Sequence, residues 1–241
     1  MTNQQKIEKH TIVQSIILHL YPGILMGVFY FLIRQPVQDF GYPSIFALML
    51  AIIFVTLPVE LGYLLIKGKQ ATGRYTLDDL ISYRTPIPWW QYIMWVLIVF
   101  VLVGAIFTVL KPVENILIDK LFFWIPTLDS GLDGSYSKTA LIVTYITMFI
   151  FGVIVGPLVE ELYFRGYLLA RIPGKYTELL HSFLFAAYHV FTPWMVISRT
   201  VGLLPLVIAV KKKNIYIGIA VHILVNLLDL IAGFVFIASV T

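Results

Sequence analysis

The 241-residue sequence contains no cysteine. A chain without cysteine has no disulfide framework, no thiolate metal site and no cysteine nucleophile, which excludes several classes of enzyme. Charged residues are also scarce, at 12%, whereas soluble domains carry about 25%. Because 59% of the residues are hydrophobic, the chain cannot cover itself with a water-facing surface. The composition therefore predicts an integral membrane protein.

Long apolar runs recur along almost the whole sequence. A helix needs about 20 residues, at 1.5 Å each, to cross about 30 Å of hydrocarbon. The runs lack the alternation that a transmembrane barrel needs, so helices are the expected spanning elements. The expected spans are 12–33, 44–66, 89–110, 139–169, 178–191, 194–210 and 214–237. The fifth and sixth are short and meet at Thr192 and Pro193, so we expect them to tilt or to form one interrupted unit.

The runs predict an all-α fold, a polytopic transmembrane helical bundle of about seven to eight spans, with residues 1–241 forming a single membrane-embedded domain. Lysine and arginine cluster before the first span, within 67–84, within 165–175 and within 211–213. If the spans alternate in direction, these segments lie on one side, and cytoplasmic loops carry the excess of such residues. We therefore expect a cytoplasmic N-terminus. The net charge of +4 follows from these anchors and predicts contact with the lipid bilayer, with no nucleic acid as partner.

Ionisable residues inside the expected spans are the candidates for function. Each costs about 2.5–3.5 kcal/mol on insertion scales and by default indicates a function or a buried partner. The fourth span carries Glu160, Glu161 and Arg165. Glu161 and Arg165 are four residues apart, share a helix face and are expected to form an ion pair. Glu160 is turned about 100° away and stays free to act.

Two further groups of polar residues lie in the fifth and seventh spans. The fifth carries Phe185 and His189, and the seventh carries His222 and Asn226, which share a helix face. At about 1.5 Å per residue, Glu160 and His189 each lie about 16 Å from the basic end of their span, and His222 and Asn226 lie about 12 to 18 Å from theirs. We therefore expect these side chains at one level inside the bilayer.

These residue types allow two kinds of hydrolysis. A buried glutamate beside a histidine can act as a general base that activates water, and His222 and Asn226 can donate hydrogen bonds to a developing oxyanion. Alternatively, Glu160, His189 and His222 can ligate a divalent metal such as zinc and leave a position open for water. Neither route needs a covalent nucleophile.

The three motifs together resemble the signature of the CAAX protease and bacteriocin-processing (CPBP/Abi) family of intramembrane endopeptidases, which includes the type II CAAX prenyl proteases. That signature is Glu-Glu-x-x-x-Arg, Phe-x-x-x-His and His-x-x-x-Asn or Asp on successive membrane helices. The chain matches each motif, in order, within about 149–229. The resemblance implies a water-activating pair, an oxyanion-stabilising pair and a supporting group, respectively Glu160 with His189, His222 with Asn226, and Glu161 with Arg165 and Phe185.

The resemblance also implies the substrate and the location. We expect an enzyme of the plasma membrane that cuts a peptide bond near the cytoplasmic surface, in a CAAX-type prenylated protein or in a membrane or leader peptide. A mechanism without a metal cofactor is favoured over one with zinc. The short loops and the lack of cysteine are compatible with a bacterial source, and the oligomeric state is not determined by the sequence. The alternatives are a non-enzymatic bacteriocin-immunity or membrane binding protein and a transporter.

Five other polar residues within the spans receive mostly structural interpretations. Glu60 is expected to form a structural hydrogen bond or to lie at an interface, with a place along the substrate path as the alternative. His19 and His181 are expected to be interfacial or structural. We expect Arg199 to reach outward toward lipid headgroups and Asp229 to be a support residue.

Overall fold

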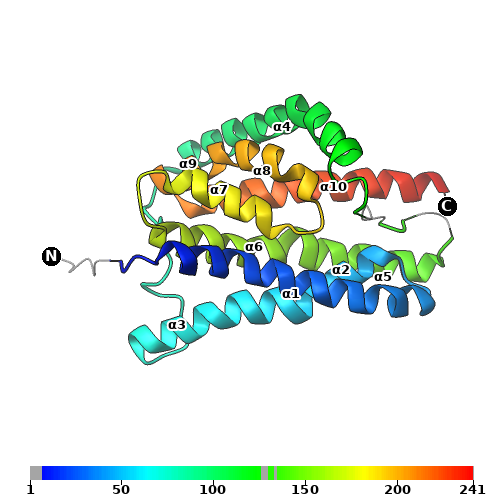
Figure 1. Ribbon diagram of the computed structural model, residues 1–241, viewed down its shortest axis with the longest axis horizontal. Helices are drawn as coiled ribbons and strands as arrows, with labels where there is room; N and C mark the ends of the chain where they lie inside the picture. The colour runs from blue at the N-terminus through cyan, green and yellow to red at the C-terminus, as the bar shows by residue number, and fades with distance from the viewer. Residues whose placement is uncertain (1–6, 126–129, 133–134, 241) are drawn as a thin grey trace.

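The protein is described by a computed structural model that covers residues 7–125, 130–132 and 135–240, with side chains described up to residue 231. These residues form helices and no strands, which confirms the predicted all-α fold. The helices run roughly along the long axis of the molecule, and the two ends of the chain lie at opposite ends of that axis (Figure 1).

The first half of the chain forms three long helical runs. Thr11 begins the first by accepting a hydrogen bond from the Gln14 backbone N–H, and the Gln14 side chain caps Thr11 in return. Gly73, at a φ of 78°, ends the second run in the left-handed conformation that glycine adopts readily. The elements are α1 (Ile12–Asp39), α2 (Ser44–Ala51), the π-helical η1 (Ile52–Leu61), α3 (Gly62–Thr72) and α4 (Trp89–Lys120), of which α2, η1 and α3 are continuous.

The second half contains one long run, a short hairpin and a final helix. The long run consists of α5 (Lys138–Thr147), η2 (Met148–Val155), α6 (Gly156–Glu160), η3 (Glu161–Leu168) and η4 (Leu169–Arg171). The hairpin consists of α7 (Thr177–Tyr188), η5 (Pro193–Met195), α8 (Val196–Gly202) and α9 (Leu204–Lys212), and α10 (Ile215–Val240) follows. The wide π-helical turns of η2 and η3 lie on either side of α6, and such turns occur frequently at functional sites.

Four helical runs are long and apolar enough to cross a membrane, namely 12–39, 44–72, 89–120 and 138–171. A fifth is obtained if the pair Pro193–Gly202 and Leu204–Lys212, which is bent by 42°, counts as one broken span. The 12 residues of α7 extend only about 18 Å, which is too short to cross hydrocarbon. The predicted count of seven to eight spans is therefore not confirmed, and the short fifth run is the main reason.

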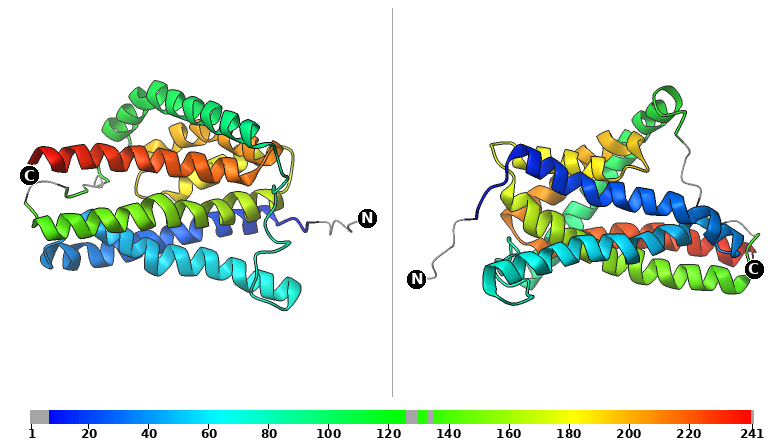
Figure 2. Two further views of the ribbon diagram at one scale, coloured as in Figure 1. Left: turned by 180° about the vertical axis from the view of Figure 1, so that it is seen from behind. Right: turned by 60° about the horizontal axis from the view of Figure 1, so that its bottom comes forward.

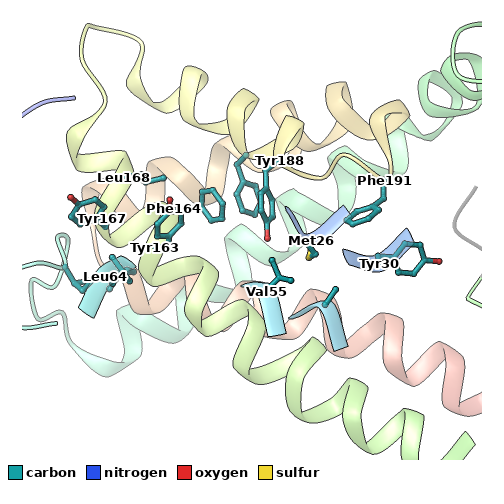
Figure 3. Packing of buried hydrophobic residues seen from close by; sticks show 14 of the residues in the cluster. Met26, Tyr30, Val55, Leu64, Tyr163, Phe164, Tyr167, Leu168, Tyr188 and Phe191 are labelled. Atoms are coloured by element: carbon teal, nitrogen blue, oxygen red, sulfur yellow. The ribbon is translucent and has the colours of Figure 1, made fainter. Parts of the chain in front are cut away.

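The helices form two sides of one bundle. On one side, α4 lies across α8, α9 and α10, and on the other α1 packs against α2, α7 and η1 (Figures 1 and 2). Aromatic residues fill the space between α1, η3 and α7: the ring centroid of Phe164 is 4.8 Å from that of Tyr188 and 4.9 Å from that of Phe185 (Figure 3 shows this core). The Tyr163 hydroxyl donates to the Leu18 carbonyl over 2.7 Å. These contacts fix the helices that carry the polar motifs.

The basic segments gather at one end of the bundle, as the alternation of spans predicts. There the His10 backbone N–H donates to the Arg171 carbonyl over 2.8 Å, and Lys211 forms a 2.8 Å ion pair with Glu178. The Asn214 side chain donates to the Thr85 carbonyl at the same end. Which side of a membrane this end faces stays a prediction.

Substitution of Gly23 by alanine is expected to destabilise the fold. An added Cβ would lie 2.0 Å from the Tyr188 carbonyl oxygen, so α1 and α7 would have to separate. Overpacking of this kind typically costs about 1–3 kcal/mol. The measurement is the thermal unfolding of purified variants in detergent. Gly62→Ala is the control, since a Cβ there meets no atom within 4 Å; equal melting temperatures for the two variants would contradict the prediction.

Candidate active site

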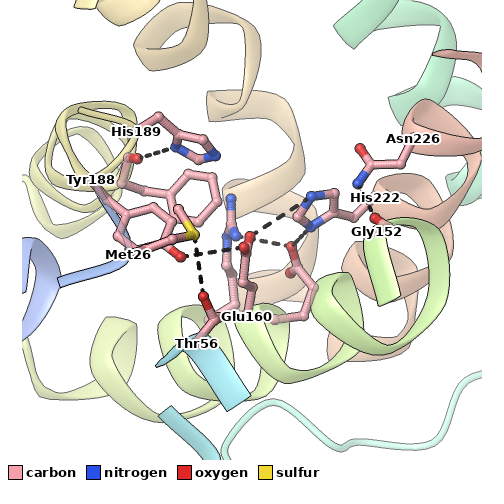
Figure 4. Close-up of polar contacts among 11 residues, drawn as sticks. Met26, Thr56, Gly152, Glu160, Tyr188, His189, His222 and Asn226 are labelled. Atoms are coloured by element: carbon pink, nitrogen blue, oxygen red, sulfur yellow. Dashed lines mark hydrogen bonds and ion pairs between the residues drawn. The ribbon is translucent and has the colours of Figure 1, made fainter. Parts of the chain in front are cut away.

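The three sequence motifs meet at one place in the structure, where α10, the end of α7 and the junction of α6 with η3 come together (Figure 4). Glu160 and Glu161 lie in the middle of the long helical run. His189 directly follows the last residue of α7, so its side chain lies at the tip of the hairpin. His222 and Asn226 lie one helical turn apart on α10.

Glu161 is held more firmly by its neighbours than Glu160 is. Its Oε1 atom lies 2.9 Å from Arg165 Nη1, which is the predicted ion pair, and 2.9 Å from His222 Nδ1. Glu161 and Arg165 are 0% and 1% exposed. The Arg165 guanidinium also lies 3.7 Å from the centre of the Phe185 ring, a cation–π contact. A buried charge needs partners of this kind because desolvation is costly.

A glycine on α10 permits this arrangement. A Cβ added to Gly218 would lie 2.7 Å from Glu161 Oε2 and 2.7 Å from the Val210 side chain. A larger residue at this position would therefore displace the carboxylate or move α10 away from it. The close approach of α10 brings His222 within reach of both glutamates.

Glu160 is held more loosely than its neighbour. Its Oε1 accepts a hydrogen bond of 3.4 Å from the Tyr188 hydroxyl, and its Oε2 lies 4.0 Å from His222 Nε2. Its side chain is 13% exposed. In the described part of the chain, no hydrogen bond joins Glu160 to His189, the partner that the resemblance implies. The histidine beside Glu160 is His222, whereas His189 forms no ion pair with Glu160 within 4.0 Å.

The hydrogen bonds of the two histidines fix which ring nitrogens carry protons. His189 Nδ1 lies 2.9 Å from the Phe185 carbonyl oxygen, which can only accept, so Nδ1 donates and Nε2 is left for other work. His222 Nδ1 likewise points to the carboxylate of Glu161, and its Nε2 points toward Glu160. In both histidines, a hydrogen bond from Nδ1 to a fixed acceptor thus sets the orientation of the ring.

Asn226 binds the backbone of the facing helix. Its Nδ2 atom donates to the Gly152 carbonyl over 2.9 Å, which ties α10 to η2. An asparagine amide carries two N–H donors and a carbonyl oxygen, so this bond leaves one N–H for a ligand.

The motifs border a cavity of about 650 Å³, a size typical of ligand-binding sites. Most of its wall is apolar and comes from α4 and α10. Its predicted site residues are Glu161, Arg165, Phe185, His189, His222 and Asn226. Glu160 is not part of this wall, but its Oε2 atom lies 4.0 Å from Nε2 of His222, which is. The contribution of α4, with side chains such as Val103 and Phe107, is not indicated by any sequence motif.

The residues proposed as zinc ligands are not arranged as a metal site. Among residues 7–125, 130–132 and 135–231, no group of three histidine, aspartate or glutamate side chains is close enough to hold one ion. The Nε2 atom of His222 lies 4.0 Å from Glu160 Oε2, and His189 forms no ion pair with Glu160 within 4.0 Å. A zinc-dependent mechanism stays a prediction that a chelator experiment tests.

Several polar residues near the site have a place that the sequence did not indicate. Tyr188 donates to Glu160, and Glu60 is fully buried and interacts electrostatically with both. Arg199 lines the cavity and donates to Thr192, so the expectation that it reaches outward to headgroups is wrong. Arginine and tyrosine at these positions belong to no short motif, and only the packing of the hairpin brings them to the site.

The other histidines have the structural role expected of them. His19 Nδ1 lies 2.7 Å from the Ser15 carbonyl oxygen, and its Nε2 lies 3.1 Å from His181 Nδ1. Both residues are fully buried, and the ring centroid of His19 lies 5.6 Å from that of Phe164. They join α1 to α7 and do not contact the cavity.

Comparison with known families agrees with this geometry. Residues 142–228 match the family described as type II CAAX prenyl endopeptidase Rce1-like. This match supports assigning the chain to the CAAX protease family. The matched part of the chain contains all three motifs and excludes α1 to α4. No curated protein and no solved structure matches the chain. The four or more apolar helices of the chain and this assignment are both consistent with a multi-pass membrane protein.

The two neighbouring glutamates are expected to differ in their contribution to stability. Glu161→Gln removes the ion partner of the buried Arg165, and the loss of one member of such a pair costs about 3–5 kcal/mol. Glu160→Gln weakens only a long hydrogen bond from Tyr188 and a 4.0 Å contact with His222, so it is expected to cost less than about 1 kcal/mol. Thermal unfolding in detergent measures both. A Glu160 variant as unstable as the Glu161 variant would show that Glu160 is held equally tightly.

Proposed function

We propose that the protein is an intramembrane endopeptidase that hydrolyses a peptide bond near the cytoplasmic membrane surface. The substrate is a CAAX-type prenylated protein or a membrane or leader peptide. The observation that carries the proposal is the convergence of the three motifs on one mostly apolar cavity, with the loosely bonded Glu160 at 4.0 Å from His222 in its wall. The family match over 142–228 supports the same reaction class.

Glu160 is the proposed base. Its Oε2 atom faces the Nε2 atom of His222 across 4.0 Å, a separation at which a water molecule can be held between two polar groups. Glu160 takes a proton from that water as the oxygen attacks the carbonyl carbon of the substrate. His189, whose Nε2 bonds to none of the described residues, helps to orient the water from the cavity side. The carbonyl oxygen becomes an oxyanion in this step.

His222 and Asn226 are the proposed donors to that oxyanion. Glu161 holds His222 in a fixed orientation through Nδ1, and Asn226 retains one amide N–H beyond the one that binds Gly152. Preorganised donors of this kind contribute about 3–4 kcal/mol to lowering a barrier. The C–N bond then breaks, Glu160 returns its proton to the leaving nitrogen, and the products are a carboxylic acid and an amine.

Glu160→Gln is expected to lower peptide cleavage at least about a hundredfold while the fold is retained, because the amide cannot take the proton of water. The assay measures cleavage of quenched fluorescent peptides, including farnesylated CAAX peptides, by purified protein in detergent. Glu178→Gln is the matched control, since Glu178 lies outside the cavity and pairs with Lys211. Full activity of the Glu160 variant would overturn the proposed mechanism.

The same assay with a strong chelator separates the two mechanisms. Activity that is insensitive to the chelator agrees with the glutamate mechanism. Loss of activity that zinc restores would instead make Glu160, His189 and His222 metal ligands. A folded wild-type protein that cleaves none of the peptides would contradict the proposal and favour a binding role.

Gly104→Phe is expected to narrow the cavity and to lower kcat/KM for substrates with bulky side chains by about tenfold. Gly104 lines the cavity, and a Cβ there meets no atom within 4 Å, so a larger side chain can enter the open space without disturbing the helices. Substrates with small side chains should be affected less. Gly62→Phe, at an equally open glycine outside the cavity, serves as control; equal effects of both variants on all peptides would contradict this role for the cavity.

A further inference from the structure

Arg199 is a cation at the cavity that the three motifs do not use. It lies on α8, in the hairpin whose tip carries His189, and it lines the cavity together with His189 and His222. Its guanidinium is partly buried. Through Nη1 it donates to the carbonyl and the hydroxyl oxygen of Thr192. Both of these acceptors are neutral, so they orient the charge without neutralising it.

No carboxylate of the described residues lies within 4.0 Å of Arg199. The acidic group on the adjacent helix α4 is Glu114, which is held by Ser198 Oγ and by Lys111 Nζ at 3.0 Å. Glu114 and Glu160 act on Arg199 only at longer range. Asp229 borders the same cavity but forms no ion pair with Arg199.

An unpaired arginine at this depth is costly. It lies in the bent helix pair that is the fifth candidate span, and a charge inside a span costs about 2.5–3.5 kcal/mol and usually faces a partner or a ligand path. Arg165, the other arginine of the cavity, has its own carboxylate. Of the two arginines at the cavity, Arg199 is therefore the one without an anionic partner among the described residues.

The chemistry of that anion follows from the guanidinium and from the wall opposite. A guanidinium presents five N–H donors in a planar fork that matches the two oxygens of a carboxylate, and only Nη1 of Arg199 is bonded here. The rest of the cavity is mostly apolar, with Val103 and Phe107 of α4 and Val225 of α10 in its wall. The cavity thus suits an apolar peptide segment that ends in, or carries, a carboxylate.

We propose that Arg199 binds a carboxylate of the substrate and thereby selects which peptide bond reaches Glu160. The carboxylate is the free C-terminus of the peptide or an acidic side chain close to it. The proposal rests on the proposed peptidase activity and adds a specificity-determining residue to it. Arg199 lies on the same hairpin as His189, so a bound carboxylate places the scissile bond within a few residues of the anion.

Three peptides of one apolar sequence test the proposal: one with a free C-terminal carboxylate, one with a C-terminal amide, and one with the amide and a glutamate as its last residue. For the wild type, KM is expected to be about ten- to a hundredfold lower for the free acid than for the amide, the usual range for a charge-assisted hydrogen bond. A low KM for the glutamate peptide as well would identify the side chain as a sufficient source of the carboxylate.

Arg199→Gln is expected to raise KM for the acid to that of the amide with little change in kcat. Arg199→Lys keeps the charge and should restore part of the preference, which a purely structural role for the guanidinium would not do. Arg171→Gln, a cation outside the cavity, is the control and should leave the preference intact. Equal KM values for acid and amide in the wild type, or an unchanged preference in Arg199→Gln, would overturn the proposal even if cleavage is normal.

Binding provides a test that does not depend on cleavage. Glu160→Gln protein is heated with the acid or the amide peptide in excess, and the shift in melting temperature reports binding. The acid should give the larger shift, and Arg199→Gln introduced into the same variant should abolish the difference. Equal shifts for acid and amide would refute the role of Arg199. A larger shift for the acid, together with no cleavage of any peptide by the wild-type protein, would refute the peptidase activity alone.

Discussion

The demand of a buried arginine for a counter-charge organises the centre of this molecule. Arg165 is almost completely enclosed, and Glu161 on the same helix provides the carboxylate. That carboxylate also receives His222 from α10, so one ion pair fixes the long central helix, the final helix and the orientation of a histidine. Phe185 of α7 covers the guanidinium and adds the third helix. Glu160 keeps only a long hydrogen bond from Tyr188 and a 4.0 Å contact with His222, because its neighbour takes up the closer charged partners.

The sequence predicted those parts of the structure that depend on spacing along one helix. The all-α fold, the ion pair of Glu161 with Arg165 and the gathering of basic segments at one end follow from apolar runs, from a separation of four residues and from charge distribution. The proximity of the motifs was also predicted, from the rise per residue, whereas their depth in a bilayer stays a prediction. Each of these needs only local geometry.

The remaining parts depend on how helices pack, which spacing does not determine. The choice of His222 rather than His189 beside Glu160 depends on how closely α10 approaches, and a glycine at 218 decides that. The wall from α4 and the place of Arg199 in it depend on contacts between distant segments. The predicted span count is not confirmed, because α7 is largely apolar but has only 12 residues, and hydropathy alone does not distinguish a short span from half of a hairpin.

The short length of α7 has a consequence for water. The helix ends at Tyr188, part of the way along the bundle, and the backbone from His189 to Thr192 is not helical. Non-helical backbone at membrane depth persists only where protein buries it or where it borders a hydrated space, because its amides need partners. The tip of the hairpin therefore places polar backbone groups within an otherwise apolar interior. If the chain hydrolyses a peptide bond there, water, the second reactant, is held at the same turn that ends the helix.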